Sequence, residues 1–136
     1  MVNIKESKEW QRLADMDLRT AEYLKKMKPL PIEIICYHCQ QSAEKYLKGY
    51  LVFCGMAPPG MHDLDELCKL CLKYSDTFKS IEDPCSDLTA YGVQPRYPME
   101  LTLDEEDIKQ ALDSAKAVKD FVVAIIKEKI NEEKTV

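Results

Sequence analysis

The sequence predicts an all-α protein, an up-and-down bundle of four to five antiparallel helices. Long stretches carry apolar residues at steps of three and four, the period of a helix with one buried face. Only 4 of the 136 residues are glycine, and the prolines are confined to a few places. This composition disfavours an all-β fold with many tight turns. The length suits one domain, so we assign residues 1–136 to a single unit with a core of about 7–127.

The first helix is predicted over residues 7–27, with an apolar stripe that includes Trp10 and Leu18. Asp17 lies on or beside that stripe, so its carboxylate either reaches water at the edge of the core or pairs with a cation. Residues 28–31, Lys-Pro-Leu-Pro, end this helix because neither proline suits a helix interior. So short a connection favours an antiparallel return by the next helix.

The second helix is predicted over residues 32–54 and would be about 35 Å long. One face is apolar, and the opposite face carries Gln40, Gln41, Glu44, Lys45 and Lys48. This polar face is either a solvated surface with an ordinary Glu44–Lys48 ion pair or part of a ligand groove.

A loop over residues 55–63 follows, rich in glycine and proline. Asp63 is predicted to cap a helix over residues 64–74, with Glu66 as its reciprocal partner in a variant of the capping box. A less regular stretch comes next, in which Pro84 either kinks the chain or begins a new helix.

The last helix is predicted to begin at a capping box formed by Thr102 and Glu105. Its apolar stripe runs from Ile108 to Ile126. The polar tail after Lys129 is predicted to fray, leaving residues 130–136 outside the core.

Cys36-x-x-Cys39 and Cys68-x-x-Cys71 have the spacing of half-sites for zinc. Both pairs fall inside strongly helical patterns, whereas zinc motifs hold such pairs on tight turns. We therefore expect buried, reduced thiols, no metal site and no cofactor.

The net charge of −5 is uneven, because residues 1–60 carry 9 basic and 7 acidic side chains and the remainder carry 10 and 17. A protein that coats nucleic acid is normally basic, so any RNA contact should be a local pocket. The first ten residues lack the apolar core of a signal peptide, and no apolar run is long enough to span a bilayer. We expect a cytoplasmic protein with no membrane contact.

Few residues are candidates for catalysis or ligand binding. The sequence has no Gly-rich phosphate loop, no His-Glu-x-x-His zinc helix and no Gly-x-Ser-x-Gly motif. His62 lies in a loop beside a helix cap, where it is either functional or a simple loop residue. Arg96 and Tyr97 stand between two prolines, which would hold a guanidinium for phosphate and a ring for stacking on a base. The alternative is that Arg96 pairs with a carboxylate of the bundle, such as Asp17 or Glu44.

These residues together resemble the HEPN family of small helical domains. The resemblance rests on Trp10 with Asp17-Leu18, on the stretch from His38 to Lys48, on His62-Asp63-Leu64 and on Arg96-Tyr97-Pro98. It implies a helical bundle, often a homodimer, of the type that is encoded beside a minimal nucleotidyltransferase in toxin–antitoxin or related complexes. Some members are metal-independent ribonucleases in which an Arg is followed, after four to six residues, by a His.

This sequence departs from the ribonuclease pattern because no histidine follows Arg96. The resemblance therefore favours a subunit that is not an enzyme and that binds a nucleotide or RNA end. Arg96 and His62 are the only candidates for a catalytic role. The predicted binding residues are Arg96, Tyr97, His62, Gln41, Glu44, Lys45, Lys48 and Asp17. The alternatives are a ribonuclease toxin with an atypical site and a purely structural interaction module.

Overall fold

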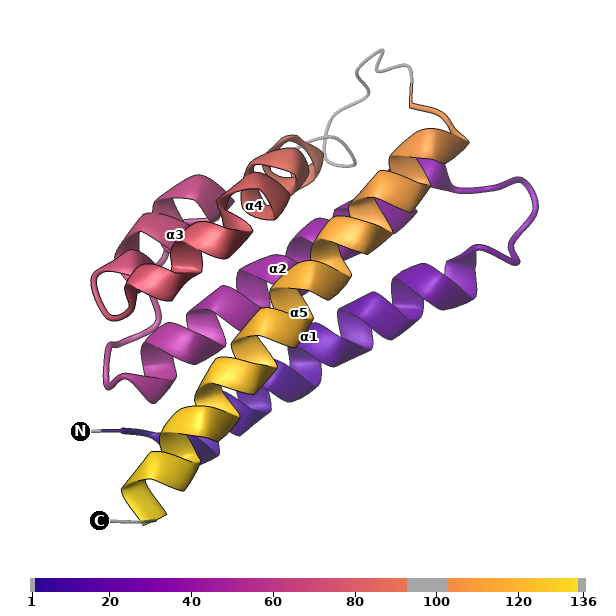
Figure 1. Ribbon diagram of the computed structural model, residues 1–136. Helices are drawn as coiled ribbons and strands as arrows, with labels where there is room; N and C mark the ends of the chain where they lie inside the picture. The colour runs from indigo at the N-terminus through magenta and orange to yellow at the C-terminus, as the bar shows by residue number, and fades with distance from the viewer. Residues whose placement is uncertain (1, 93–102, 135–136) are drawn as a thin grey trace.

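The computed structural model describes residues 2–92 and 103–134, and every regular element within them is helical. Figure 1 shows three long helices with their axes roughly aligned and two shorter helices packed on one side. The all-α prediction is confirmed. In chain order the elements are α1 (Ile4–Leu24), α2 (Ile32–Phe53), α3 (Leu64–Leu72), the 3-10 helix η1 (Asp76–Ile81), α4 (Glu82–Thr89), the 3-10 turn η2 (Ala90–Gly92) and α5 (Glu105–Lys134).

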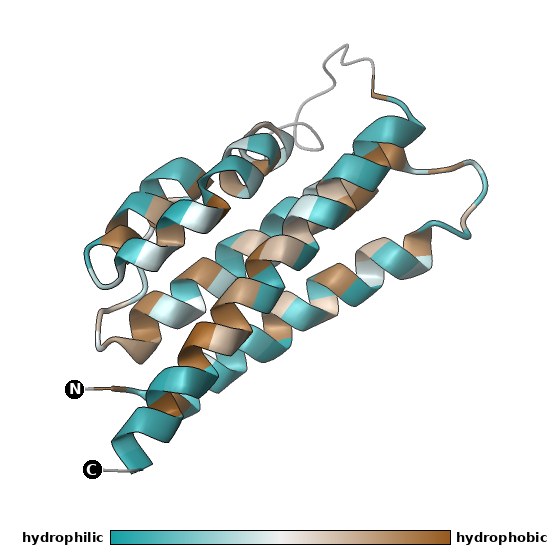
Figure 2. Cartoon of the chain, in the orientation of Figure 1, coloured by the Kyte–Doolittle hydropathy of each residue, from teal (hydrophilic) through white to brown (hydrophobic). Residues whose placement is uncertain are grey.

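The helix α2 lies at the centre of the bundle and contacts α1, α3, α4, α5 and η2. Fifteen of its 22 residues are buried, far more than one amphipathic face would require. In Figure 2 each long helix carries both hydrophobic and hydrophilic residues. For α2 the consequence is that part of its polar face is also enclosed by protein.

The first helix begins earlier and ends earlier than predicted. Asn3 caps α1, because its Oδ1 accepts a hydrogen bond from the Glu6 backbone N–H (3.0 Å) while its Nδ2 donates to Glu6 Oε2 (2.9 Å). This reciprocal cap adds nearly one turn before Ser7. The helix ends at Leu24 rather than at residue 27.

The helices α1 and α2 pack closely at Gly49. Ser7 Oγ donates a hydrogen bond across the interface to the Gly49 carbonyl oxygen (2.7 Å). A Cβ atom on Gly49 would lie 3.2 Å from the Cβ of Trp10. Glycine is therefore the residue that lets the two backbones pack this tightly.

The cap of α3 is Asp63, as predicted. Its Oδ1 accepts from the backbone N–H groups of Asp65 (2.8 Å) and Glu66 (3.2 Å). The carboxylate of Glu66 accepts from Lys69 Nζ (3.2 Å), whereas the predicted capping box would aim it back at Asp63. Pro84 lies in the first turn of α4, so it begins a helix rather than kinking one.

The start of α5 is capped by a different pair from the one predicted. Asp104 Oδ1 accepts from the backbone N–H groups of Glu106 (3.0 Å) and Asp107 (3.3 Å), and Asp107 Oδ2 accepts from the Asp104 N–H (2.9 Å). Thr102, predicted as the cap, lies outside the described residues. In the structure α5 continues to Lys134, with half-buried Ile130 packed against the core and residues 131–134 exposed.

Five of the six cysteines are buried and Cys54 is half-buried. Loss of solvent on burial is the largest cause that raises the pKa of Cys36 and of Cys39, each to about 12, so both remain thiols at neutral pH. Within the described residues no three His, Cys, Asp or Glu side chains are grouped to hold a metal ion. In the same part of the chain no helix is long and apolar enough to cross a membrane.

The Gly49 contact predicts that Gly49→Val destabilises the protein by about 1–3 kcal/mol, the usual cost of overpacking a tight interface. Urea unfolding monitored by circular dichroism measures the change. The matched control is Gly60→Val, because a Cβ on Gly60 meets nothing within 4 Å. Equal stability of the two variants would contradict the close packing of α1 on α2.

Candidate functional site

The polar face of α2 is not the solvated surface that the sequence allowed. Gln40, Glu44 and Lys48 are only 1%, 4% and 5% exposed. The loop before α3 and the turn η2 close over this side of α2, as contacts of His62 and Gly92 with its side chains show. Because an ionised side chain is costly to bury, each charge here needs close partners.

Glu44 is the centre of the first polar cluster. Its Oε2 accepts from Lys48 Nζ (3.0 Å) and from His62 Nδ1 (3.0 Å), and its Oε1 accepts from Gln40 Nε2 (3.3 Å). Two helical neighbours four residues away and one loop residue therefore satisfy a single buried carboxylate. His62 itself is 64% exposed, so it closes this cluster toward solvent.

Asp17 is the centre of a second cluster, where α1 meets α2. Its Oδ1 bonds His38 Nδ1 (3.0 Å), its Oδ2 accepts from Lys45 Nζ, and its side chain is 14% exposed. Of the two alternatives left by the sequence, pairing with a cation is correct and exposure at the edge is wrong. Burial alone would raise the pKa of Asp17, but the hydrogen bonds from His38 and Lys45 outweigh it and hold that pKa below its ordinary value.

The two clusters share one arrangement, in which a carboxylate binds a lysine and the Nδ1 atom of a histidine. An ionised carboxylate only accepts hydrogen bonds, so Nδ1 carries the proton in both His38 and His62. In the neutral imidazole the lone pair is then on Nε2. A carboxylate at Nδ1 that fixes the tautomer and the ring is how proteins prepare a histidine for acid–base chemistry.

The amides of Gln40 and Gln41 connect the first cluster to the turn η2. Gln41 Nε2 donates to Gln40 Oε1 (2.8 Å), and Gln40 Nε2 also donates to the His62 carbonyl oxygen (3.3 Å). A Cβ on Gly92 would lie 3.0 Å from Gln40 Cδ. Gly92 thus allows the backbone of η2 to rest directly on this amide.

A sequence model of one protein family, described as the HEPN domain, matches residues 7–130. The chain belongs to the HEPN family. The crystal structure of an archaeal HEPN homologue has a TM-score of 0.68 and 24% sequence identity, and the match covers 88% of this chain and 97% of that one. At this identity the comparison supports the fold alone. A comparison with curated proteins gave no match.

The HEPN fold brings most of the predicted site residues together on or beside α2. Two predicted residues, Arg96 and Tyr97, lie outside the described residues. The suggested partners of Arg96 within the bundle, Asp17 and Glu44, already bind other cations. The remaining predicted residues belong to the two clusters or bond to them: Asp17, Gln41, Glu44, Lys45, Lys48 and His62.

Sequence reasoning missed two members of these clusters, His38 and Gln40. His38 precedes Lys45 by seven residues, which is two helical turns, so both can reach the same carboxylate on α1. Gln40 precedes Glu44 by four residues and bonds it as a helical neighbour. These spacings were visible in the sequence, but which carboxylate they would meet was not.

Removing the lysine of the first cluster should be costly. Lys48→Met leaves Glu44 as a buried charge without its cation and should lower the free energy of unfolding by about 3–5 kcal/mol. Adding Glu44→Gln should recover most of that loss. The matched control is Lys69→Met, whose pair with Glu66 is exposed, so its effect should stay within about 0.5 kcal/mol. Urea denaturation measures all three, and equal losses for Lys48→Met and Lys69→Met would contradict the buried pair.

The lowered pKa of Asp17 gives the protein an acid-sensitive contribution to stability. Because the folded-state pKa lies below the unfolded value, this contribution is present above about pH 4 and is lost as the pH falls through the folded value. Asp17→Asn should therefore be less stable than the wild type by about 1–3 kcal/mol at pH 7, between the costs for exposed and buried pairs. The difference should close in acid.

Thermal melts from pH 3 to pH 7 test this prediction. The control is Asp113→Asn, because the pair of Asp113 with Lys109 is long (3.9 Å) and exposed. A gap between wild type and Asp17→Asn that is the same at every pH would show that Asp17 is not held ionised by its partners.

Proposed function

We propose that this HEPN protein is a nucleotide- or RNA-binding subunit that acts with a minimal nucleotidyltransferase in a toxin–antitoxin-like system. One observation supports the binding site most directly. Asp17 on α1 and Glu44 on α2 hold His38 and His62 by Nδ1, and each carboxylate is itself fixed by a lysine. This arrangement directs the two Nε2 lone pairs away from the carboxylates, where a ligand could use them.

The charges of the clusters indicate which residues of the proposed site would contact phosphate and which would position other side chains. Lys45 and Lys48 each balance one carboxylate, so the described part of the site carries no excess positive charge while the histidines are neutral. A phosphate group would gain most from Arg96, whose guanidinium suits bidentate contacts. Half-exposed Lys45 would add a contact to phosphate, and buried Lys48 would keep Glu44 and His62 in position.

The proposed site also includes Arg96 and Tyr97, on the strength of the sequence. Arg96 follows Gly92 by four residues, a contour length of at most about 14 Å. Gly92 rests on the Gln40 amide, which in turn bonds Glu44. In this proposal Tyr97 stacks on the base, and Gln41 hydrogen-bonds its edge.

A protein partner fits the charge of the chain better than long RNA does. With a net charge of −5 the chain would be repelled by an extended phosphate backbone. We therefore propose a homodimer, located in the cytoplasm, that binds a small nucleotide or an RNA end and associates with the nucleotidyltransferase.

A second candidate function, a metal-independent ribonuclease, is favoured by the geometry of His62. Its Nδ1 is fixed by Glu44 and its ring is open to solvent, as a general base requires. Nε2 would take the proton of an RNA 2′-hydroxyl, and the 2′-oxygen would attack phosphorus. The bond to the 5′-oxygen would break, and that oxygen would take a proton from water. Arg96 would stabilise the charge on the phosphate. The products would be a 2′,3′-cyclic phosphate and a 5′-hydroxyl.

Fluorescence anisotropy with a labelled five-nucleotide RNA and with a labelled ATP analogue tests the proposal. Arg96→Ala and His62→Ala should each weaken binding by about tenfold or more, the loss expected when a hydrogen bond to a charged group is removed. Lys79→Ala, an exposed lysine of η1, should bind like the wild type. Circular dichroism confirms that each variant is folded.

The same preparations distinguish the alternatives. RNA cleavage by the wild type that disappears in both variants would support the ribonuclease. Affinity unchanged by either substitution would remove these residues from the site. No binding and no rise in melting temperature with nucleotide, beside a stable partner complex, would support a purely structural interaction module.

A further inference from the structure

The outer side of α1 carries an apolar stripe that has no partner in the bundle. The buried residues of α1, Ala14 and Leu18 among them, face the core. On the other side Tyr23 is 72% exposed, and Leu13, Met16 and Met27 are also exposed. We name this stripe the outer seam: Leu13, Met16, Thr20 and Tyr23 lie on α1, and Met27 follows just after the helix ends at Leu24.

The spacing of the outer seam is that of a helix-packing surface. Its four members on α1 follow each other at steps of three, four and three, which are the a and d positions of a heptad. Of the eight exposed large hydrophobic side chains within the described residues, four belong to this one face. Scattered apolar residues need no explanation, but a continuous stripe on one helix marks a site of interaction.

A groove of about 890 Å³ lies along the outer seam, between α1 and α5. Met16 and Tyr23 line it from α1, and Lys116 and Lys119 line it from α5. The two lysines form ion pairs across the groove, Lys116 with Glu22 (2.8 Å) and Lys119 with Asp15 (2.7 Å). Three seam residues, Met16, Thr20 and Tyr23, therefore line an open groove beside α5, and Arg19 and Lys26 line it with them.

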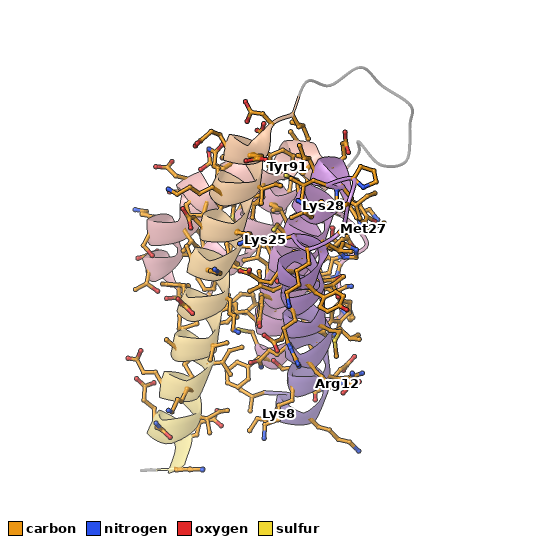
Figure 3. All side chains as sticks on the ribbon, turned by 90° about the vertical axis from the view of Figure 1, so that its right-hand side faces the viewer. Lys8, Arg12, Lys25, Met27, Lys28 and Tyr91 are labelled. Atoms are coloured by element: carbon orange, nitrogen blue, oxygen red, sulfur yellow. The ribbon has the colours of Figure 1, made fainter. Side chains whose placement is uncertain are left out.

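One edge of the outer seam is positively charged. Arg12 and Arg19 each precede a seam residue and are seven residues apart on α1, so they form a row beside the stripe, and Lys26 continues it in the turn after the helix. Arg12 already pairs with Glu9. Arg19 and Lys26 make no ion pair within the part of the chain that the structure describes, and the Lys26 ammonium lies 5.6 Å from the centre of the Tyr23 ring. Figure 3 shows this side of the molecule, with Arg12 near one end of α1 and Met27 near the other.

We propose that the outer seam binds an amphipathic helix of another protein, with apolar residues at the same spacing and carboxylates along the edge that meets Arg12, Arg19 and Lys26. Apolar anchors at steps of three and four are how a helix is held in such a groove. The carboxylates of the partner helix would be the counter-charges for the basic row. This inference does not rest on the proposed nucleotide site, because it uses none of that site's residues.

Charge also argues against a second copy of this chain as the occupant. In an antiparallel pair of α1 helices equivalent edges face each other, so Arg19 would meet the partner's Arg19. In a parallel pair the residue opposite Arg12 would be the partner's Asp17. That carboxylate is already bound by His38 and Lys45. Neither pairing neutralises the basic row.

Two synthetic 21-residue helical peptides test the proposal. Both carry leucine at the a and d positions, and one carries glutamate and the other lysine along the edges. Anisotropy should show binding of the glutamate peptide at least tenfold tighter than that of the lysine peptide. Tyr23→Ala should weaken it tenfold, and the double variant Arg19→Glu/Lys26→Glu should reverse the preference. The control variants are Tyr74→Ala and Lys69→Glu, both on exposed residues of the α3 side.

The outcomes that overturn the proposal are equally definite. Equal affinity for both peptides, or an affinity that the α1 variants do not change, would rule out the basic edge as a determinant of peptide binding. A dimer in analytical ultracentrifugation that Met16→Glu and Tyr23→Ala convert to monomer would show that a second copy occupies the seam. If the proposed nucleotide site fails its own test, these peptide results would be unchanged, so the two proposals are tested separately.

Discussion

The buried carboxylate of Glu44 is the constraint on which the polar side of this bundle depends. An anion that is 4% exposed on the central helix must be matched from several directions. Lys48 and Gln40 reach it along α2, and His62 reaches it from the loop before α3. Satisfying one charge thus fixes the position of a loop histidine.

Much of the fold could be predicted because its signals are local. The apolar periodicity of each long helix, the prolines after α1 and the Asp63 cap all act within a few residues. The errors fell at helix ends, where short side chains compete to cap: Asn3 lengthens α1 and Asp104 replaces the expected cap of α5.

The candidate site was predicted less completely because it depends on tertiary contacts. The helical spacing of polar and apolar residues cannot tell whether the polar face of α2 meets water or protein, because Glu44 and Lys48 are four residues apart either way. His62, which bonds Glu44, is 18 positions away along the chain, and Gly92, which lies against Gln40, is 52 positions away. His38 was undervalued for the same reason, because its partner Asp17 is on another helix.

The most direct test of this account is nitrogen-15 NMR of the imidazole rings, since His38 and His62 are the only histidines of the chain. The account predicts that both neutral rings carry their proton on Nδ1. Addition of a five-nucleotide RNA should shift the Nε2 resonances. Rings protonated on Nε2, or Nε2 resonances that do not move with saturating RNA, would contradict the claim that Asp17 and Glu44 hold these histidines ready for a ligand.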